Sequence, residues 1–282
     1  MTMQLGCHIQ TWGAVRARAS GSQSLKELFL ESKAPQARCV REAELLGYEG
    51  IELFDGDLLA WLEAAGTIAT RRLDVAGVYS SYQFVYDDLW KDELHKLRRV
   101  CSAATRAPTR NLILGGGAVR STGVSDGDVM TLAARLDEAA AVAADHGLAA
   151  HFHPHPAAGE YSADRLSRII ETSTIGICPD LAVLGKAGID PVDFIKTYRE
   201  RITYVHVKDY RSGEDIEVGL GELDLAAVAS HLVETKHPGW VVIELDATVS
   251  EPMHAHRYML NALRHALRDA RAGGRDGAEE AR

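Results

Sequence analysis

A short run of residues decides how this chain folds: Ile202-Thr203-Tyr204-Val205-His206-Val207-Lys208-Asp209-Tyr210. Its apolar and β-branched start predicts a buried strand, and its end carries three chemically active side chains. Side chains alternate along a strand, so Val205 and Val207 point one way while His206 and Lys208 share the other face. Titratable groups gathered at a strand end indicate a functional site. The alternative is that His206 only satisfies a hydrogen bond in the core.

A strand followed by a helix recurs along the whole chain. Glycines such as Gly47 and Gly147 come after runs with helical spacing and predict where helices end. Apolar, strand-like runs occupy eight segments: residues 5–9, 48–53, 73–78, 111–114, 148–156, 175–180, 202–210 and 240–246. Eight strands that alternate with helices predict an α/β protein with one (β/α)8 (TIM) barrel, rather than an open doubly wound sheet.

The barrel is expected to occupy residues 1–271 as a single domain. Residues 14–33 break the alternation after the first strand, so we expect an insertion that crosses one barrel end and could act as a lid. Residues 272–282 are small and charged, and we expect a disordered tail there.

The composition favours a small-molecule partner. Lys and Arg number 31 and Asp and Glu number 40, giving a formal net charge of −9, which argues against a nucleic-acid or anionic-membrane partner. The four cysteines are widely spaced and form no C-x-x-C pair, which fits buried thiols in a reducing compartment. The sequence shows neither a signal-peptide pattern nor an apolar run of 18 residues, so we expect a cytoplasmic protein. Homo-oligomerisation is left open.

The strand ends supply a candidate metal site, because in a (β/α)8 barrel eight loops converge where the strands end. One candidate ligand follows each of four neighbouring strands: His153, Asp180, His206 and Glu244. Two imidazoles and two carboxylates suit one divalent cation, with Mn²⁺ expected first and Co²⁺, Mg²⁺ or Zn²⁺ as alternatives. His151 shares a strand face with His153, so either could be the ligand. Asp180 could instead cap a turn, and Glu244 could pair with Lys208.

A cation at this position suits enolate chemistry on a polyhydroxy ketone or aldehyde, because it polarises the carbonyl and acidifies the adjacent C–H. Glu244 is the expected base. Lys208 is expected to stabilise the developing oxyanion or, with a depressed pKa, to assist proton transfer. His155 is expected to orient a substrate hydroxyl. The other expected substrate contacts are Trp12, Glu52, Tyr79, His151 and Asp209.

Several motifs occur in order along the chain: H-x-H at 151–153, Asp180, Tyr204-Val205-His206-Val207-Lys208-Asp209, Gly219-x-Gly221-x-Leu223-Asp224, and Gly239-Trp240-Val241-Val242-Ile243-Glu244. Together they resemble the xylose-isomerase-like sugar phosphate isomerase/epimerase superfamily, and look closest to its inosose dehydratase branch. The resemblance implies a divalent metal held by a strand-five Glu or His, a strand-six Asp, a strand-seven His and a strand-eight Glu, which here match His153, Asp180, His206 and Glu244.

Two departures from the family pattern bear on the reaction. Many epimerases of the family carry Glu where His153 stands, and the family often carries His where Val183 stands. With one carboxylate base, one-base enolisation or β-elimination, such as loss of water, is favoured over two-base inversion. The expected substrate is a keto-sugar, keto-glycoside or keto-cyclitol. The alternatives are a two-base sugar epimerase or isomerase, with His153 or Lys208 as second base, and a non-catalytic sugar-binding or assembly subunit. A related barrel that cleaves abasic DNA is disfavoured by the negative net charge.

Overall fold

A computed structural model describes residues 2–13, 15–19, 25–65, 72–117, 122–155, 162–246, 248 and 250–279. Eight parallel strands form one sheet in the order β8-β7-β6-β5-β4-β1-β12-β9. They are β1 (Gln4–His8), β4 (Gly50–Phe54), β5 (Asp74–Tyr82), β6 (Asn111–Gly116), β7 (Ala149–Phe152), β8 (Gly176–Ile177), β9 (Tyr204–Val207) and β12 (Trp240–Ile243). Backbone bridges from Ile177 to Ile202 and from Asp180 to His206 join the β8 and β9 edges. The predicted (β/α)8 barrel is confirmed.

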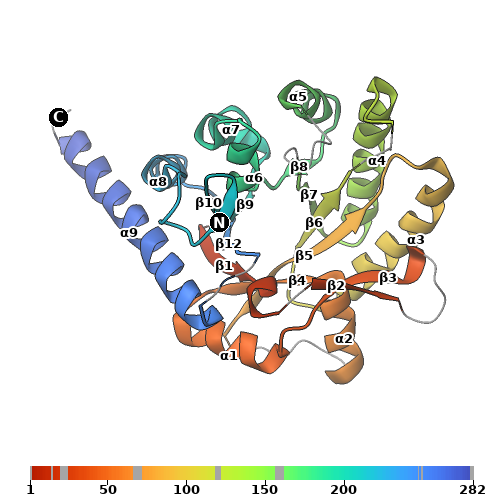
Figure 1. Cartoon of the computed structure of the whole chain (residues 1–282), viewed down its shortest axis with the longest axis horizontal. Helices are drawn as coiled ribbons and strands as arrows, with labels where there is room; N and C mark the ends of the chain where they lie inside the picture. The colour runs from red at the N-terminus through yellow and green to blue at the C-terminus, as the bar shows by residue number, and fades with distance from the viewer. Residues whose placement is uncertain are drawn as a thin grey trace.

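Helices surround the sheet on its outer side (Figure 1). They are α1 (Gln36–Leu46), α2 (Asp55–Ala65), α3 (Asp87–Ala104), α4 (Asp126–Asp145), α5 (Ala163–Thr172), α6 (Leu181–Lys186), α7 (Pro191–Thr197), α8 (Leu225–Glu234) and α9 (Pro252–Glu279). Gly47 ends α1 with a φ of 81°, as predicted, because this left-handed conformation favours glycine. Ser125 and Asp128 start α4 with a reciprocal capping box. None of the described helices is long and apolar enough to cross a membrane.

The barrel interior holds a small hydrophobic cluster, separate from the main core between sheet and helices. Its buried members are Ala76, Ile113, Cys178, Tyr204, Trp240 and Val242. Glycines make room for the two rings: a Cβ on Gly50 would lie 2.5 Å from the Trp240 ring, and one on Gly77 would lie 2.8 Å from the Tyr204 hydroxyl. The polar side chains at the strand ends therefore rest on a closely packed floor.

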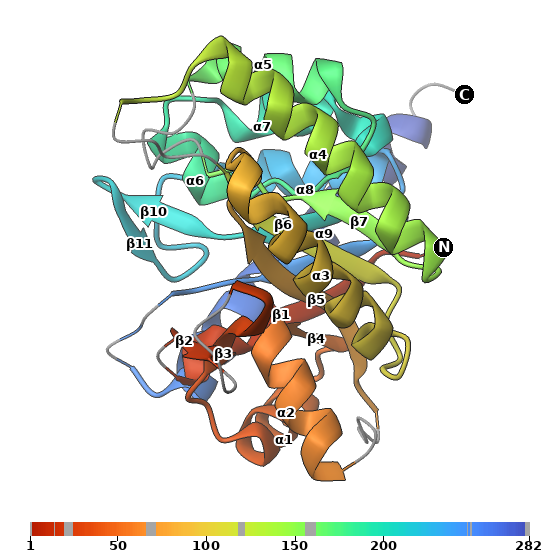
Figure 2. The same ribbon diagram turned by 90° about the vertical axis from the view of Figure 1, so that its right-hand side faces the viewer.

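Two antiparallel hairpins lie at the same end of the barrel (Figure 2). β2 (Val15–Ala19) pairs with β3 (Leu28–Ser32), and β10 (Asp209–Arg211) pairs with β11 (Glu214–Ile216). The first hairpin occupies the predicted insertion at 14–33, of which residues 14 and 20–24 lie outside the described part of the chain. The second hairpin was not predicted, because strands of three residues are too short to show a recognisable alternation.

The C-terminal end differs from the expectation of a disordered tail at 272–282. α9 continues to Glu279, and residues 280–282 lie outside the described residues. Ala, Arg and Glu in this segment favour helix, and extending a formed helix is easier than nucleating a new one.

Buried carboxylates hold the β2–β3 hairpin against the barrel. Asp55 Oδ1 accepts a hydrogen bond from the Leu30 backbone N–H at 2.7 Å, and Asp57 Oδ2 accepts one from the Ser32 N–H at 3.1 Å. Lys96 Nζ lies 3.1 Å from Asp55 Oδ2 and balances its charge. Burial raises the pKa of Asp57 to about 7, although the Ser32 N–H opposes this shift. The hairpin is thus fixed to the barrel through β3.

Replacing Asp57 by Asn is expected to change how folding stability depends on pH. The folded protein keeps a proton on Asp57 up to about pH 7, whereas an unfolded aspartic acid loses it near pH 4. Wild-type stability therefore contains a contribution that falls as pH rises between these values. The Asn amide oxygen still accepts the Ser32 hydrogen bond and carries no charge. Urea unfolding measures the free energy of unfolding of both proteins at about pH 5 and about pH 8. The difference, variant minus wild type, should be about 1 kcal/mol or more larger at the higher pH.

The matched control is Glu171→Gln, which removes an exposed carboxylate from α5. If both variants respond to pH alike, or if Asp57→Asn follows wild type, Asp57 does not hold a proton in the folded state.

Candidate functional site

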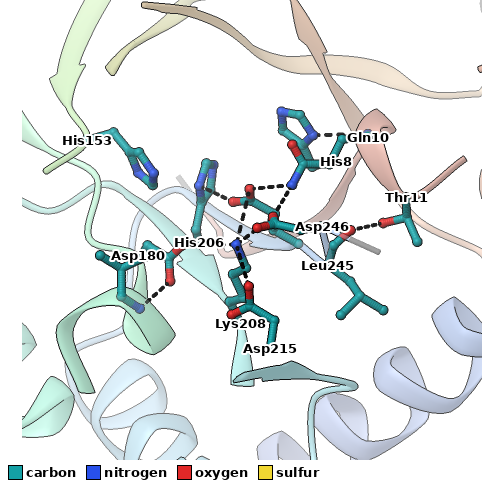
Figure 3. Close-up of polar contacts among 12 residues, drawn as sticks. His8, Gln10, Thr11, His153, Asp180, His206, Lys208, Asp215, Leu245 and Asp246 are labelled. Atoms are coloured by element: carbon teal, nitrogen blue, oxygen red, sulfur yellow. Dashed lines mark hydrogen bonds and ion pairs between the residues drawn. The ribbon is translucent and has the colours of Figure 1, made fainter. Parts of the chain in front are cut away.

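Four side chains from four strand ends meet at the C-terminal mouth of the barrel. Figure 3 labels three of them: His153, Asp180 and His206. His153 follows β7, Asp180 follows β8, His206 lies in β9 and Glu244 follows β12. Candidate ligand atoms of His153, Asp180 and Glu244 all lie within 4.8 Å of one another. His206 Nδ1 lies 2.7 Å from Glu244 Oε2. The structure therefore brings together the four residues that the strand ends and the motifs singled out.

Each imidazole of this group is held through one ring nitrogen. His206 Nε2 lies 2.7 Å from Glu52 Oε2, and His153 Nδ1 lies 3.1 Å from the backbone carbonyl oxygen of Cys178. A carboxylate or carbonyl oxygen only accepts, so these two nitrogens are the donors. His206 Nδ1 and His153 Nε2 are left to face the centre, where His206 Nδ1 lies 2.7 Å from Glu244 Oε2 without making a hydrogen bond among the described residues. This is the usual support of metal-binding histidines.

The two carboxylates are held in the same way. Asp180 Oδ1 accepts from the Val183 backbone N–H at 3.0 Å, and so caps α6, as the alternative interpretation of Asp180 proposed. Glu244 Oε1 accepts from Gln10 Nε2 at 2.8 Å. The second oxygens, Asp180 Oδ2 and Glu244 Oε2, are buried and make no hydrogen bond in the described part of the chain, but they lie 3.7 Å from Lys208 Nζ and 2.7 Å from His206 Nδ1. Two buried carboxylate oxygens that face one centre supply negative charge that a bound cation would neutralise.

Lys208 lies among four carboxylates at the edge of this centre. Its Nζ is 2.6 Å from Asp246 Oδ1, 3.7 Å from Asp180 Oδ2, 3.8 Å from Asp215 Oδ2 and 3.9 Å from Glu244 Oε1. Burial lowers the pKa of Lys208, but these carboxylates raise it by more, so the pKa lies above its ordinary value. Lys208 is a fixed ammonium, and the hypothesis of a depressed pKa is wrong.

The two central histidines titrate in opposite directions. Burial lowers the pKa of His153 well below its usual value, and neighbouring imidazoles lower it further, so this ring is neutral. Burial also lowers the pKa of His206, but Cys178, Glu52 and Glu244 raise it by more, and the net shift is upward. The carboxylate of Glu244 therefore stabilises positive charge on the neighbouring His206 ring.

Two of the expected substrate contacts lie beside the centre. The Tyr79 hydroxyl is 3.3 Å from His155 Nε2, and the Tyr79 and His155 rings are centred 5.6 and 4.5 Å from the His153 ring. His151 lies deeper in the barrel, where its Nε2 is 3.2 Å from Asn111 Oδ1. His153, and not His151, is thus the strand-five residue that joins the candidate ligands.

The other three expected substrate contacts, Glu52, Trp12 and Asp209, are engaged by other protein groups instead of facing the centre. The fully buried Glu52 supports His206 from behind. Trp12 stacks on His256, with ring centres 4.3 Å apart, and donates to Glu42 Oε2 at 2.7 Å. Asp209 is saturated by four backbone N–H groups, those of Tyr210, Gly219, Gly221 and Leu223. It orders the loop before α8 instead of reaching the centre.

Two polar residues of the site were not predicted. Gln10, which lies two positions after β1, donates to both Glu244 and Asp246. Its position at a strand end was a signal that could have found it. Asp215, on β11, contacts Lys208 and lies 2.7 Å from Lys186 Nζ through Oδ1. The sequence carries no comparable signal for Asp215, because its hairpin was not predicted.

Comparison with known proteins gives one family match over most of the chain. Residues 40–266 match the model of the xylose isomerase-like TIM barrel family. An inosose dehydratase from Geobacillus kaustophilus is 26% identical over 157 residues, covering 48% of this chain and 50% of that protein. The matched segment thus spans about half the length of this curated relative.

Solved structures show the same fold over nearly the whole chain. An L-ribulose 3-epimerase has a TM-score of 0.72 at 15% identity, covering 96% of this chain and 97% of that one. A 3-keto-D-glucoside 4-epimerase from E. coli has a TM-score of 0.64 at 16% identity, with coverages of 93% and 99%. The motifs, the closed barrel and the family match agree, and the chain belongs to the xylose isomerase-like TIM barrel family.

Proposed function

We propose that this protein is a divalent-cation-dependent isomerase or lyase that removes a proton next to the carbonyl of a keto-sugar, keto-glycoside or keto-cyclitol. The observation that carries the proposal is the group of four buried side chains, each held through one polar atom while the other faces a common centre. A dehydratase and two epimerases among the similar proteins support chemistry of this class.

The four residues fit a cation that accepts both nitrogen and oxygen ligands. His153, Asp180, His206 and Glu244 would hold it, with Mn²⁺ as the best match and Co²⁺, Mg²⁺ or Zn²⁺ as alternatives. A cation would bind Asp180 Oδ2 and Glu244 Oε2, which make no hydrogen bond among the described residues and lie beside the cationic groups Lys208 and His206. When bound, the ion supplies Lewis-acid polarisation of the substrate carbonyl.

Glu244 is the proposed base. Burial raises its pKa, but Lys208 and His206 lower it by more, so the carboxylate is ionised and ready to accept a proton. Gln10 holds Oε1 and fixes the direction of the carboxylate. Lys208 Nζ, 3.9 Å from Glu244 Oε1, is placed to stabilise the negative charge that develops on the substrate oxygen as the proton leaves.

One-base chemistry suits this site better than two-base inversion. By the family resemblance, His153 stands where many epimerases have a second carboxylate. Lys208, the other candidate for a second base, keeps its proton because carboxylates raise its pKa. We therefore favour β-elimination or one-base isomerisation, with Tyr79 and His155 orienting a substrate hydroxyl.

The departure at Val183 leaves the candidate ligands in place. Val183 contributes its backbone N–H to Asp180, and this bond directs the second Asp180 oxygen to the centre. This arrangement favours a catalytic role over a non-catalytic sugar-binding role.

Replacing Glu52 by Gln is expected to weaken Mn²⁺ binding by about 10- to 100-fold, because the neutral amide no longer fixes the tautomer and orientation of His206. Isothermal titration calorimetry of the metal-free protein measures the change. Glu42→Gln is the matched control, since it removes a buried carboxylate that holds Trp12 outside the centre. Wild-type affinity in Glu52→Gln, or an equal loss in both variants, contradicts the proposed support of His206.

Replacing Glu244 by Gln is expected to lower turnover of an inosose by about 10²- to 10⁴-fold, because the amide cannot accept the proton and is a weaker cation ligand than the carboxylate. Exchange of the substrate C–H with solvent deuterium, followed by NMR, tests the abstraction step directly. Glu234→Gln, on the exposed face of α8, is the control. Undiminished exchange in Glu244→Gln excludes this base. The product of the wild-type protein separates loss of water from inversion of a stereocentre.

Replacing Lys208 by Met is expected to lower kcat by about 10²- to 10³-fold, because the charge that faces the developing oxyanion is lost. Mn²⁺ affinity should rise in the same variant, because a competing positive charge is removed from among the carboxylates. Steady-state kinetics and calorimetry measure the two effects, with Lys91→Met on the surface of α3 as control. Loss of Mn²⁺ binding together with kcat would mean that Lys208 only maintains the structure.

A further inference from the structure

Cys178 faces the inside of the barrel. It is fully buried in the interior cluster with Tyr204 and Val242, and it precedes Asp180 by two positions at the end of β8. All four cysteines are described, and the other three pack in the main core between the sheet and the helices: Cys7, Cys39 and Cys101. The Cys178 thiol therefore lies inside the barrel, next to the candidate metal ligands His153 and His206.

The thiol completes a second set of candidate ligands. Atoms of His153, Cys178 and His206 all lie within 4.8 Å of one another, as do those of His153, Asp180 and Glu244. All three residues of the second set are buried, and His206 Nδ1 makes no hydrogen bond in the described part of the chain, although Glu244 Oε2 lies 2.7 Å away. These two groups of three share His153, and the proposed four-residue cation site also contains His206.

The sets differ in the kind of cation that they prefer. The carboxylates of Asp180 and Glu244 are hard oxygen ligands, which suit ions such as Mn²⁺ and Mg²⁺. A cysteine sulfur with two imidazole nitrogens is a softer set, and Cys/His combinations are typical of Zn²⁺. A cation bound by the thiol set would therefore lie in the same part of the barrel as one bound by the carboxylate set, but the two sets prefer different metals.

We propose that His153, Cys178 and His206 form a second cation site that takes Zn²⁺ and other thiophilic ions. Because His153 and His206 belong to both proposed sites, a thiophilic ion and the ion held through Asp180 and Glu244 exclude each other. The inference rests on the proposed function for the identity of the competing ion. It makes thiophilic metals inhibitors of this protein, because their binding withdraws His153 and His206 from the site that contains Asp180 and Glu244.

Titration of the metal-free full-length protein with Cd²⁺, a spectroscopic substitute for Zn²⁺, tests the proposal. A sulfur-to-metal charge-transfer band in the near ultraviolet should grow and saturate. Added Mn²⁺ should shift the midpoint of this titration to higher Cd²⁺, as competition for a shared ligand requires. A wild-type protein without the band, or a midpoint that Mn²⁺ does not move although calorimetry shows Mn²⁺ bound, overturns the proposal.

Three variants locate the band. Cys178→Ala should abolish it, whereas Cys101→Ala, which removes a buried thiol from α3, should keep it. Asp180→Asn should keep the band and lose about tenfold or more in Mn²⁺ affinity, because it removes one oxygen ligand of the other set. A band that persists in Cys178→Ala, or that disappears in Cys101→Ala, refutes the assignment.

The two proposals fail in different ways. A protein that shows the band but binds no Mn²⁺ retains the thiol site and loses the proposed carboxylate site. A protein that binds Mn²⁺ through Asp180 but shows no band retains the proposed function and loses the thiol site. Circular dichroism of each variant confirms that the barrel is folded.

Discussion

The buried hydrogen bond between Glu52 and His206 is the interaction on which the rest of the site depends. Glu52 is fully buried, and it accepts from His206 at 2.7 Å and from the Tyr204 hydroxyl at 2.8 Å, with His8 Nε2 at 3.6 Å. A carboxylate removed from water without such partners would destabilise the fold. The partners that make burial of Glu52 tolerable also fix the His206 ring, and so decide where its second nitrogen points.

Negative charge exceeds positive charge at the barrel mouth. Lys208 is the ammonium that faces Asp180, Asp215, Glu244 and Asp246, and its raised pKa reflects that imbalance. The upward shift of the His206 pKa has a similar origin in nearby negative groups. A site of this kind attracts a further cation, and the chemistry proposed for it uses that attraction to polarise a carbonyl.

Strand alternation predicted much of this arrangement, because the inward faces of neighbouring barrel strands converge at one end. It could not decide between His151 and His153, since both share a face and differ only in depth along the barrel axis. Trp12 was expected at the mouth because it follows a strand, but a 3₁₀ turn over Ile9–Trp12 directs it to His256, a contact between distant parts of the chain. Asp215 depends on a hairpin whose strands are too short to show a pattern.

The junction between β8 and β9 has a consequence for stability. Among the described residues, the sheet is joined there by two isolated backbone bridges, and one of them links Asp180 to His206. An ion bound by both side chains would cross-link the β8 and β9 edges, where the barrel closes. Metal binding would then stabilise the folded barrel, and the midpoint of thermal unfolding would depend on which metal is bound and at what concentration.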